Sequence, residues 1–157
     1  MRPEARRAEH GFTLLEVVCV IALVAMLAAV ALPLLPRNTS RARLHAYALE
    51  AASLLKADRN AAIRGGGEMS TLVDAPSRAI RSGATGQAIR IPSDVRFDAL
   101  LPQTCRRRAV LSTISFFADG TSCGGAVALT GLDSSYEIRV NWLTGRVEVV
   151  SRSQGAS

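Results

Sequence analysis

One carboxylate, Glu16, lies inside a long apolar run, and its position is the first sign of chemistry in this chain. From Phe12 to Leu35 it is the only ionisable side chain among Val, Leu, Ile, Ala, Met, Cys, Phe, Thr and Pro residues. An acidic group costs free energy in an apolar environment, so an acid in such a run is a candidate for function.

The junction between Gly11 and Phe12 is a second candidate, this time for peptide cleavage. Ten residues precede Gly11, including Arg2, Arg6 and Arg7. A secretory signal peptide carries its small-residue cleavage site after the apolar region. Here the small residue precedes the apolar region, so cleavage would remove the basic leader and retain the apolar segment.

The apolar run is long enough to position both features in a membrane. At about 1.5 Å per residue, a helix over residues 12–36 would span a hydrocarbon core of about 30 Å. Arginines before the run favour a cytoplasmic N-terminus, although Arg37, Arg41 and Arg43 follow it. An ordinary single-pass anchor is the alternative, but it gives no reason for a carboxylate four residues inside its edge.

A second helix is predicted after the run. Apolar residues within Asn38–Arg64 recur at spacings of three, four or seven, which predicts one buried stripe: Leu44, Ala48, Ala51, Leu55 and Ala62. Three consecutive glycines, residues 65–67, should end it. Together with the apolar run, Phe12–Arg64 could form one helix of about 80 Å, bent near Pro33.

The rest of the chain has the pattern of short β-strands. Alternating residues followed by Leu143-Thr144-Gly145 predict a C-terminal hairpin. Residues from Ala75 to Gly86 are predicted to be a loop. The expected strands are Met69–Val73, Ala88–Ile91, Val95–Leu101, Ala109–Phe117, Ala126–Leu129, Tyr136–Trp142 and Arg146–Val150.

The sequence G-F-T-L-L-E at the start of the run resembles the class III leader of type IV pilins and type II secretion pseudopilins. The resemblance implies that a prepilin peptidase cuts between Gly11 and Phe12 and methylates the new N-terminus of Phe12. Glu16 would then be the fifth mature residue, paired with the α-amino group of Phe12 in a neighbouring subunit. Pro33 would occupy the position of a helix-bending proline.

Two further segments narrow the resemblance to the minor pseudopilin H family. They are F-F-A-D-G-T-S-C-G-G at residues 116–125 and Y-E-I-R-V-N-W-L-T-G-R-V at residues 136–147, and A-D-R-N-A-A-I-R-G-G at residues 57–66 is also similar. The implied fold is pilin-like α+β: a long N-terminal helix, membrane-spanning in its first half, packed on a C-terminal antiparallel β-sandwich. The expected parts are a leader (1–11), a membrane and assembly half-helix (12–36), a soluble half-helix (37–66) and a periplasmic β-rich domain (67–157).

The resemblance also implies a role and partners. The chain would be a minor structural subunit at or near the tip of the type II secretion pseudopilus, for export across the outer membrane. Expected partners are other major and minor pseudopilins, the prepilin peptidase, the inner-membrane assembly platform and exported substrates. The expected location is the bacterial inner membrane, single-pass, with the N-terminus cytoplasmic and the C-terminal domain periplasmic, and the periplasmic pseudopilus after assembly.

A minor pilin of a type IV pilus, serving pilus assembly or DNA uptake, is the alternative function. The net charge of +6 is compatible with DNA binding. However, the basic residues are scattered, aromatic residues are few, and the dense cluster Arg106–Arg108 is either a solvated loop or a polyanion site. We therefore do not expect nucleic acid as a partner.

Catalysis and metal binding are not expected, and no cofactor is implied. His10 lies in the leader and His45 stands alone, so no Ser/His/Asp or Cys/His set can be assembled without His45. The acidic residues are dispersed. Asp119, which precedes Gly120, has the pattern of a turn residue, since one carboxylate provides too few oxygen ligands for calcium.

Cys105 and Cys123 flank the expected strand at residues 109–117 and lie in the exported part of the chain. An oxidising compartment would permit a disulfide between them. Such a bond could contribute about 3 kcal/mol to stability, and two unpaired thiols are the alternative.

Overall fold

A computed structural model describes residues 13–31 and 39–152 of the chain. These belong to two compact units, Met1–Arg37 and Asn38–Ser157. In the first unit, α1 (Leu14–Ala31) is an 18-residue helix whose described side chains are exposed. No helix in the described ranges is both long and apolar enough to cross a membrane. The predicted span over residues 12–36 extends beyond α1 on both sides, and it stays a prediction.

The second unit begins with α2 (Arg41–Gly65), whose ends follow from its sequence. Ser40 is extended and caps the helix by accepting a hydrogen bond from the backbone N–H of Arg43. Gly66, at φ 63°, provides the left-handed C-cap, so the predicted stop at the glycines is confirmed. The structure differs from the expected continuous helix over residues 12–64, because Thr39 and Ser40 are not helical and a capped helix starts after them.

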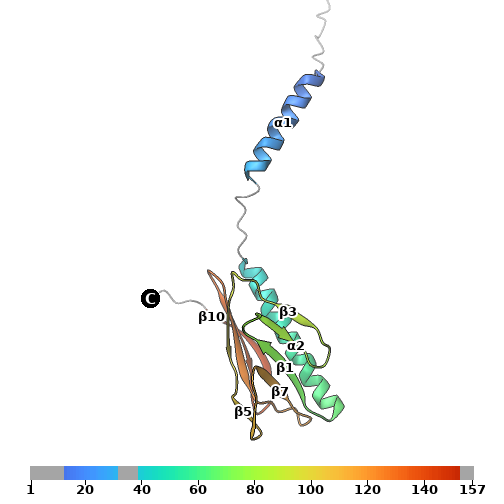
Figure 1. The fold of residues 1–157 in the computed structure, drawn as a ribbon, viewed down its shortest axis with the longest axis vertical. Coiled ribbons are helices and arrows are strands. Elements are labelled where there is room, and N and C mark those ends of the chain that lie inside the picture. Colours follow the sequence, from blue (N-terminus) through green and yellow to red (C-terminus); the bar gives the residue numbers. More distant parts are fainter. Residues whose placement is uncertain (1–12, 32–38, 153–157) are drawn as a thin grey trace, which may run out of the picture. The chain divides into compact units, whose positions relative to one another are not determined.

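Two antiparallel sheets form the rest of this unit (Figure 1). One has the strand order β3-β2-β1-β7 and the other β10-β9-β8-β4, while β5 and β6 form a separate hairpin. The strands are β1 (Met69–Asp74), β2 (Ala79–Arg81), β3 (Ala88–Arg90), β4 (Arg96–Leu100), β5 (Thr104–Cys105), β6 (Arg108–Ala109), β7 (Thr113–Phe116), β8 (Gly125–Thr130), β9 (Ser135–Val140) and β10 (Val147–Arg152).

A single core joins α2 to both sheets. All five residues of the predicted stripe are buried: Leu44, Ala48, Ala51, Leu55 and Ala62. They pack with inward-facing residues of the two sheets, including Ile80, Ile114, Phe116, Val127 and Ile138. The small alanine side chains allow the helix to approach the strands closely. The predicted α+β fold, with a helix packed on antiparallel sheets, is therefore confirmed.

The strand predictions agree with the structure for β1, β3, β4, β8, β9 and β10, whereas β2 and β5 were not predicted and one strand was expected over β6 and β7. The C-terminal hairpin is confirmed, with Val147 opposite Val140 across the turn. The segment expected as a loop, Ala75–Gly86, contains β2, which has one buried residue, Ile80, and is too short to show alternation. The expected strand Ala109–Phe117 is divided between β6 and β7, because Ser112 has a φ of 58° and interrupts the extended backbone.

Candidate functional site

The predicted assembly residues lie mostly outside the part of the chain that the structure describes. Gly11, Phe12 and Pro33 belong to ranges that are not described, so cleavage, methylation and helix bending stay predictions. Glu16 is described and stands in the first turn of α1. Its position there is favourable, since the N-terminal end of a helix dipole attracts negative charge.

Glu16 is exposed, and it makes no ion pair with any residue of the described ranges. Its backbone N–H donates to the carbonyl oxygen of Thr13 at 3.1 Å, and Thr13 Oγ1 lies 3.3 Å away as a second acceptor. Large apolar side chains surround it on α1, such as Leu14, which is 83% exposed. Both the carboxylate and the apolar surface are therefore available to an external partner.

The folded unit contains a buried carboxylate, Asp58, that was not predicted from the sequence. It is completely buried in α2 and accepts four hydrogen bonds. Thr71 Oγ1 and the backbone N–H of Gly83 (3.2 Å) donate to Oδ2, while Ser82 Oγ (2.5 Å) and the backbone N–H of Ala84 (2.9 Å) donate to Oδ1. Both oxygens act as acceptors, as in an ionised carboxylate. Asp58 thus joins α2 to β1 and to the turn between β2 and β3.

A signal for Asp58 was present in the sequence. It lies three residues after Leu55 and four before Ala62, so it falls on the same buried stripe of α2. A charged residue on such a stripe must find hydrogen-bond donors, because burial without them costs several kcal/mol.

The next residue, Arg59, connects α2 to the turn of the C-terminal hairpin. Its Nη2 donates to the carbonyl oxygen of Thr144 at 3.0 Å. Two glycines leave room for its side chain: a Cβ on Gly145 would lie 2.2 Å from the carbonyl oxygen of Gly120 and 2.9 Å from Arg59 Nε. Gly145 also has a φ of 59°, which disfavours other residues. This corner of the fold is consequently packed without space for a methyl group.

The structure pairs Cys105 with Cys123 as a disulfide, with Cα atoms 5.6 Å apart. It ties the β5–β6 hairpin to the loop before β8. Beside it, the Arg106 guanidinium lies 3.5 Å from the ring centroid of Phe117 and 3.3 Å from the carboxylate of Asp119. The hairpin is thus attached to the body of the domain at three points.

Asp119 has the predicted role of a turn residue. Its Oδ1 accepts hydrogen bonds from the backbone N–H (2.9 Å) and the hydroxyl (2.6 Å) of Thr121. These bonds, the hydroxyl first, hold the pKa of Asp119 below its ordinary value, and the charge of Arg106 adds to the effect. No group of three or more potential metal-ligating side chains occurs in the described residues.

His45 does not form a catalytic set in the structure. Its ring stacks on Tyr136, with ring centroids 4.9 Å apart and planes at 29°. This contact gives the histidine a packing role between α2 and β9.

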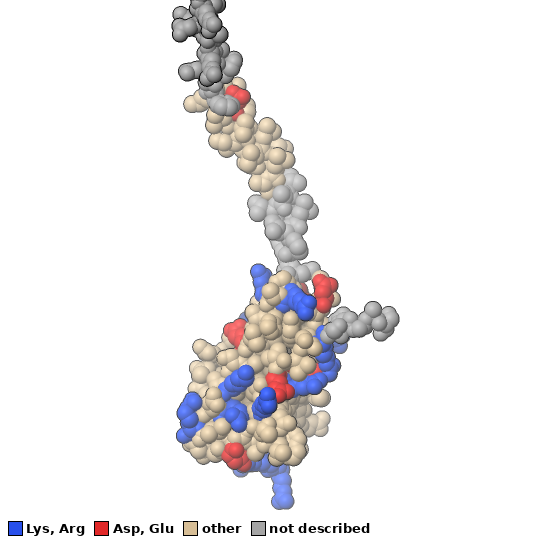
Figure 2. Space-filling model, turned by 180° about the vertical axis from the view of Figure 1, so that it is seen from behind, with Lys and Arg blue, Asp and Glu red and all other residues tan. Residues whose placement is uncertain are grey.

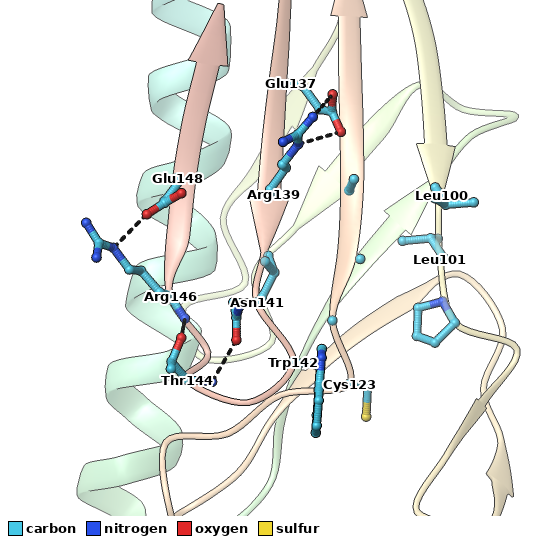
Figure 3. Close-up of a pocket in the computed structure, with 15 residues that line it drawn as sticks. Leu100, Leu101, Cys123, Glu137, Arg139, Asn141, Trp142, Thr144, Arg146 and Glu148 are labelled. Atoms are coloured by element: carbon cyan, nitrogen blue, oxygen red, sulfur yellow. Dashed lines mark hydrogen bonds and ion pairs between the residues drawn. The ribbon is translucent and has the colours of Figure 1, made fainter.

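A groove of about 820 Å³ runs along the outer face of the second sheet (Figure 3). Gly124 and Ala126 line the groove and have little or no side chain to fill it. Leu100 and Trp142 also line it and are exposed. Glu137, whose side chain is only 13% exposed, is the charged centre of this face.

Two arginines neutralise Glu137. Arg139 Nε donates to Oε1 at 2.9 Å, and Arg152 Nη2 lies 2.7 Å from Oε2. The pKa of Glu137 is lowered, mainly by the hydrogen bond from Arg139 and then by the charges of both arginines, while partial burial acts in the opposite direction. With a third pair, Arg146 and Glu148, the face combines paired charges with small residues and with the exposed apolar side chains of Leu100 and Trp142.

Comparison with known proteins finds similarity in the N-terminal segment and over most of the chain. Residues 6–32 match the family described as the prokaryotic N-terminal methylation motif. Over 147 residues, which are 92% of this chain and 85% of the relative, the sequence is 33% identical to type II secretion system protein H of Xanthomonas campestris pv. campestris.

Solved structures agree on the fold. The minor pseudopilin EpsH from the Type 2 Secretion System of Vibrio cholerae is similar with a TM-score of 0.53 and 11% identity, over 71% of this chain and 98% of EpsH. The type IV minor pilin FimU of Pseudomonas aeruginosa PAO1 is similar with a TM-score of 0.53 and 16% identity, over 71% of this chain and 91% of FimU. The fold is therefore the one that minor pseudopilins and minor pilins share, and the identity over nearly the whole chain shows that this protein belongs to the type II secretion system protein H family.

Proposed function

We propose that the chain is a minor structural subunit of the type II secretion pseudopilus. The observation that carries this function is the 33% identity to type II secretion system protein H over 92% of the chain. The methylation motif at residues 6–32 supports the same assignment. A type IV minor pilin is less favoured, because its support is a similarity of fold at 16% identity.

Processing comes first in the proposed life of the subunit. A prepilin peptidase cuts after Gly11 and methylates the amino group of Phe12. The apolar helix then holds the subunit in the inner membrane, with the β-rich domain in the periplasm. The exposed apolar side chains of α1 support this step, since they need lipid or other helices around them.

Assembly transfers α1 from lipid into a core of similar helices. Little apolar surface is exposed to water during this transfer, so the free-energy cost of leaving the lipid is small. The carboxylate of Glu16 then finds a cation in the α-amino group of Phe12 on an adjacent subunit. A wrong register leaves the carboxylate unpaired in an apolar core, so the pair would fix the register of packing.

The folded domain supplies the surfaces that contact neighbouring subunits or exported proteins. Its role is structural rather than catalytic. The proposal places the subunit near the tip of the pseudopilus, where it assembles with other major and minor pseudopilins on the inner-membrane platform.

Processing can be tested by a substitution at the cleavage site. Gly11→Val should leave an uncut precursor, because a peptidase subsite adapted to glycine has no room for a branched side chain. Mass spectrometry of the chain from cells with an active prepilin peptidase should show the full leader in the variant and its loss in the wild type. Normal cleavage of the variant, or an unprocessed wild type, would contradict the proposal.

A further inference from the structure

We propose that the β5–β6 hairpin, together with Trp142 beside it, is a docking site for an acidic protein segment that carries an apolar side chain. We call residues 104–109 the arginine hairpin. In Figure 1, β5 lies at the lower end of the folded domain, and Figure 2 shows basic side chains protruding at the same end. This inference concerns a surface that the proposed assembly through α1 does not use.

The turn of the arginine hairpin is formed by two arginines, a residue type that is unfavourable in a turn of this geometry. Cys105 pairs with Arg108, so Arg106 and Arg107 form a two-residue loop. Both have positive φ, 48° and 66°, as in a type I′ turn. Such turns strongly prefer Asn-Gly, because a side chain in the left-handed region is unfavourable. Arg106 contacts Phe117 and Asp119 within the domain, whereas Arg107 makes no ion pair with a described residue and is therefore a candidate for a role outside the fold.

The turn of the hairpin is held in place at Arg106, whereas the next two arginines are free. Arg106 contacts Phe117 and Asp119, and the adjacent Cys105 is bonded to Cys123. Arg107 and Arg108 are exposed and form no ion pair with any described residue. The fold thus presents two unpaired guanidinium groups from a rigid support, which lowers the entropic cost of binding.

A pocket with both apolar and polar walls lies beside Arg106, the first residue of the hairpin turn. It has a volume of about 370 Å³ and is lined by the disulfide, Arg106, Phe117, Trp142 and Leu143, together with the hydroxyl-bearing residues Thr104, Thr121 and Ser122. Trp142 is 67% exposed and Leu143 60% exposed, and Figure 3 shows Trp142 close to Cys123. Tryptophan and arginine are the residue types that dominate binding energy at protein interfaces. The pocket suits one apolar side chain, and the free arginines suit flanking carboxylates.

An acidic protein segment fits this surface better than a nucleic acid does. Single-stranded nucleic acid needs a basic track with several aromatic platforms. Elsewhere on the domain, some arginines are paired with acids, among them Arg96 with Asp98, Arg139 with Glu137 and Arg146 with Glu148. Others are exposed without an ion pair to a described residue, such as Arg81 on β2 and Arg90 on β3. The unpaired positive charge at the hairpin is compact, and it complements a short acidic segment.

Trp142 provides the assay, because it is the only tryptophan of the chain. The full-length chain in a neutral detergent is titrated with the peptide acetyl-Glu-Glu-Leu-Glu-Glu-amide, and tryptophan fluorescence is recorded. The same peptide with lysines in place of glutamates, a single-stranded DNA oligonucleotide and phosphatidylglycerol vesicles serve as comparison probes. We expect a saturable change with the acidic peptide that weakens as salt increases.

The double substitution Arg107→Glu with Arg108→Glu should weaken peptide binding roughly tenfold or more, since it replaces both attractive charges by repulsive ones. The neutral pair Arg107→Gln with Arg108→Gln gives the same direction with less risk to folding. Arg81→Glu with Arg90→Glu, on β2 and β3, is the matched control, because it changes the net charge equally at another exposed surface.

Selective weakening by the hairpin substitutions would support the proposal. Absence of binding, or equal weakening by the control pair, would overturn it. Tighter binding of the oligonucleotide or the vesicles than of the acidic peptide would also overturn it, because the surface would then recognise phosphates rather than a protein segment.

Discussion

Removing the buried carboxylate of Asp58 should destabilise the folded domain more than any other single change to a charged residue of α2. The substitution Asp58→Ala leaves two hydroxyls and two backbone N–H groups without their acceptor. Hydrogen bonds to a charged group contribute about 1.5–3 kcal/mol each, and relief of the cost of burying the charge offsets several kcal/mol. We expect a net loss of about 3–5 kcal/mol, a large part of the 5–15 kcal/mol typical of a domain.

The substitution Asp58→Asn keeps the shape of the side chain but replaces one hydrogen-bond acceptor by a donor. Each carboxylate oxygen accepts one hydrogen bond from a hydroxyl and one from a backbone N–H. In the asparagine variant, the amide NH₂ replaces one oxygen and faces a backbone N–H, which is also a donor, so that hydrogen bond is lost. A hydroxyl can rotate to become an acceptor, but the backbone N–H cannot. The expected loss is therefore about 1–3 kcal/mol, smaller than for alanine.

The assay is urea unfolding of a fragment beginning at Asn38, followed by far-ultraviolet circular dichroism. The fragment corresponds to the second compact unit. Glu50→Ala is the matched control, because Glu50 is an exposed acid on the same helix. If Asp58→Ala unfolds at the same urea concentration as Glu50→Ala, the hydrogen bonds of Asp58 do not hold α2 to the sheets and the reasoning fails.

Two further predictions concern the second sheet. Gly145→Ala should destabilise the same fragment by about 2–4 kcal/mol, because the added Cβ would overlap the carbonyl oxygen of Gly120 and the φ of residue 145 is positive. In the same unfolding assay, the control Gly67→Ala, whose Cβ would lie in open space, should change stability by less than about 0.5 kcal/mol. The folded pKa of Glu137 is lowered, so its stabilising effect is complete above the ordinary value of 4.5 and is lost as the pH falls through the folded value. Glu137→Gln should therefore reduce the loss of unfolding free energy between neutral and acidic pH, whereas Asp133→Asn, at an exposed position, should not; equal acid sensitivity of all three proteins would refute this assignment.

The sequence was sufficient for features that repeat over many residues. The stripe of α2, its glycine stop and the C-terminal hairpin all follow from periodicity and from local turn chemistry. The family resemblance predicted the fold, and the comparisons confirmed it. By contrast, β2 and the arginine hairpin have strands of two or three residues, which are too short to show alternation.

The site was harder to predict than the fold, because its geometry depends on tertiary contacts. Asp58 carried a local signal on the buried stripe, but its donors come from residues 71–84 and meet it only in the folded domain. The groove around Glu137 likewise requires the register of three neighbouring strands. The assembly residues pose a different difficulty, since the predicted partner of Glu16 lies on another subunit.

The most direct test of the assembly role is the substitution Glu16→Leu in cells that have the complete secretion system. Incorporation is measured by cross-linking between cysteine-substituted helices, with cleavage of the leader measured in parallel. Glu50→Leu provides a control for loss of an acid elsewhere in the chain. We predict that Glu16→Leu is inserted and cleaved normally but fails to enter the pseudopilus, and that Glu16→Asp is intermediate. Incorporation of Glu16→Leu at the wild-type level would contradict the proposed pairing with Phe12.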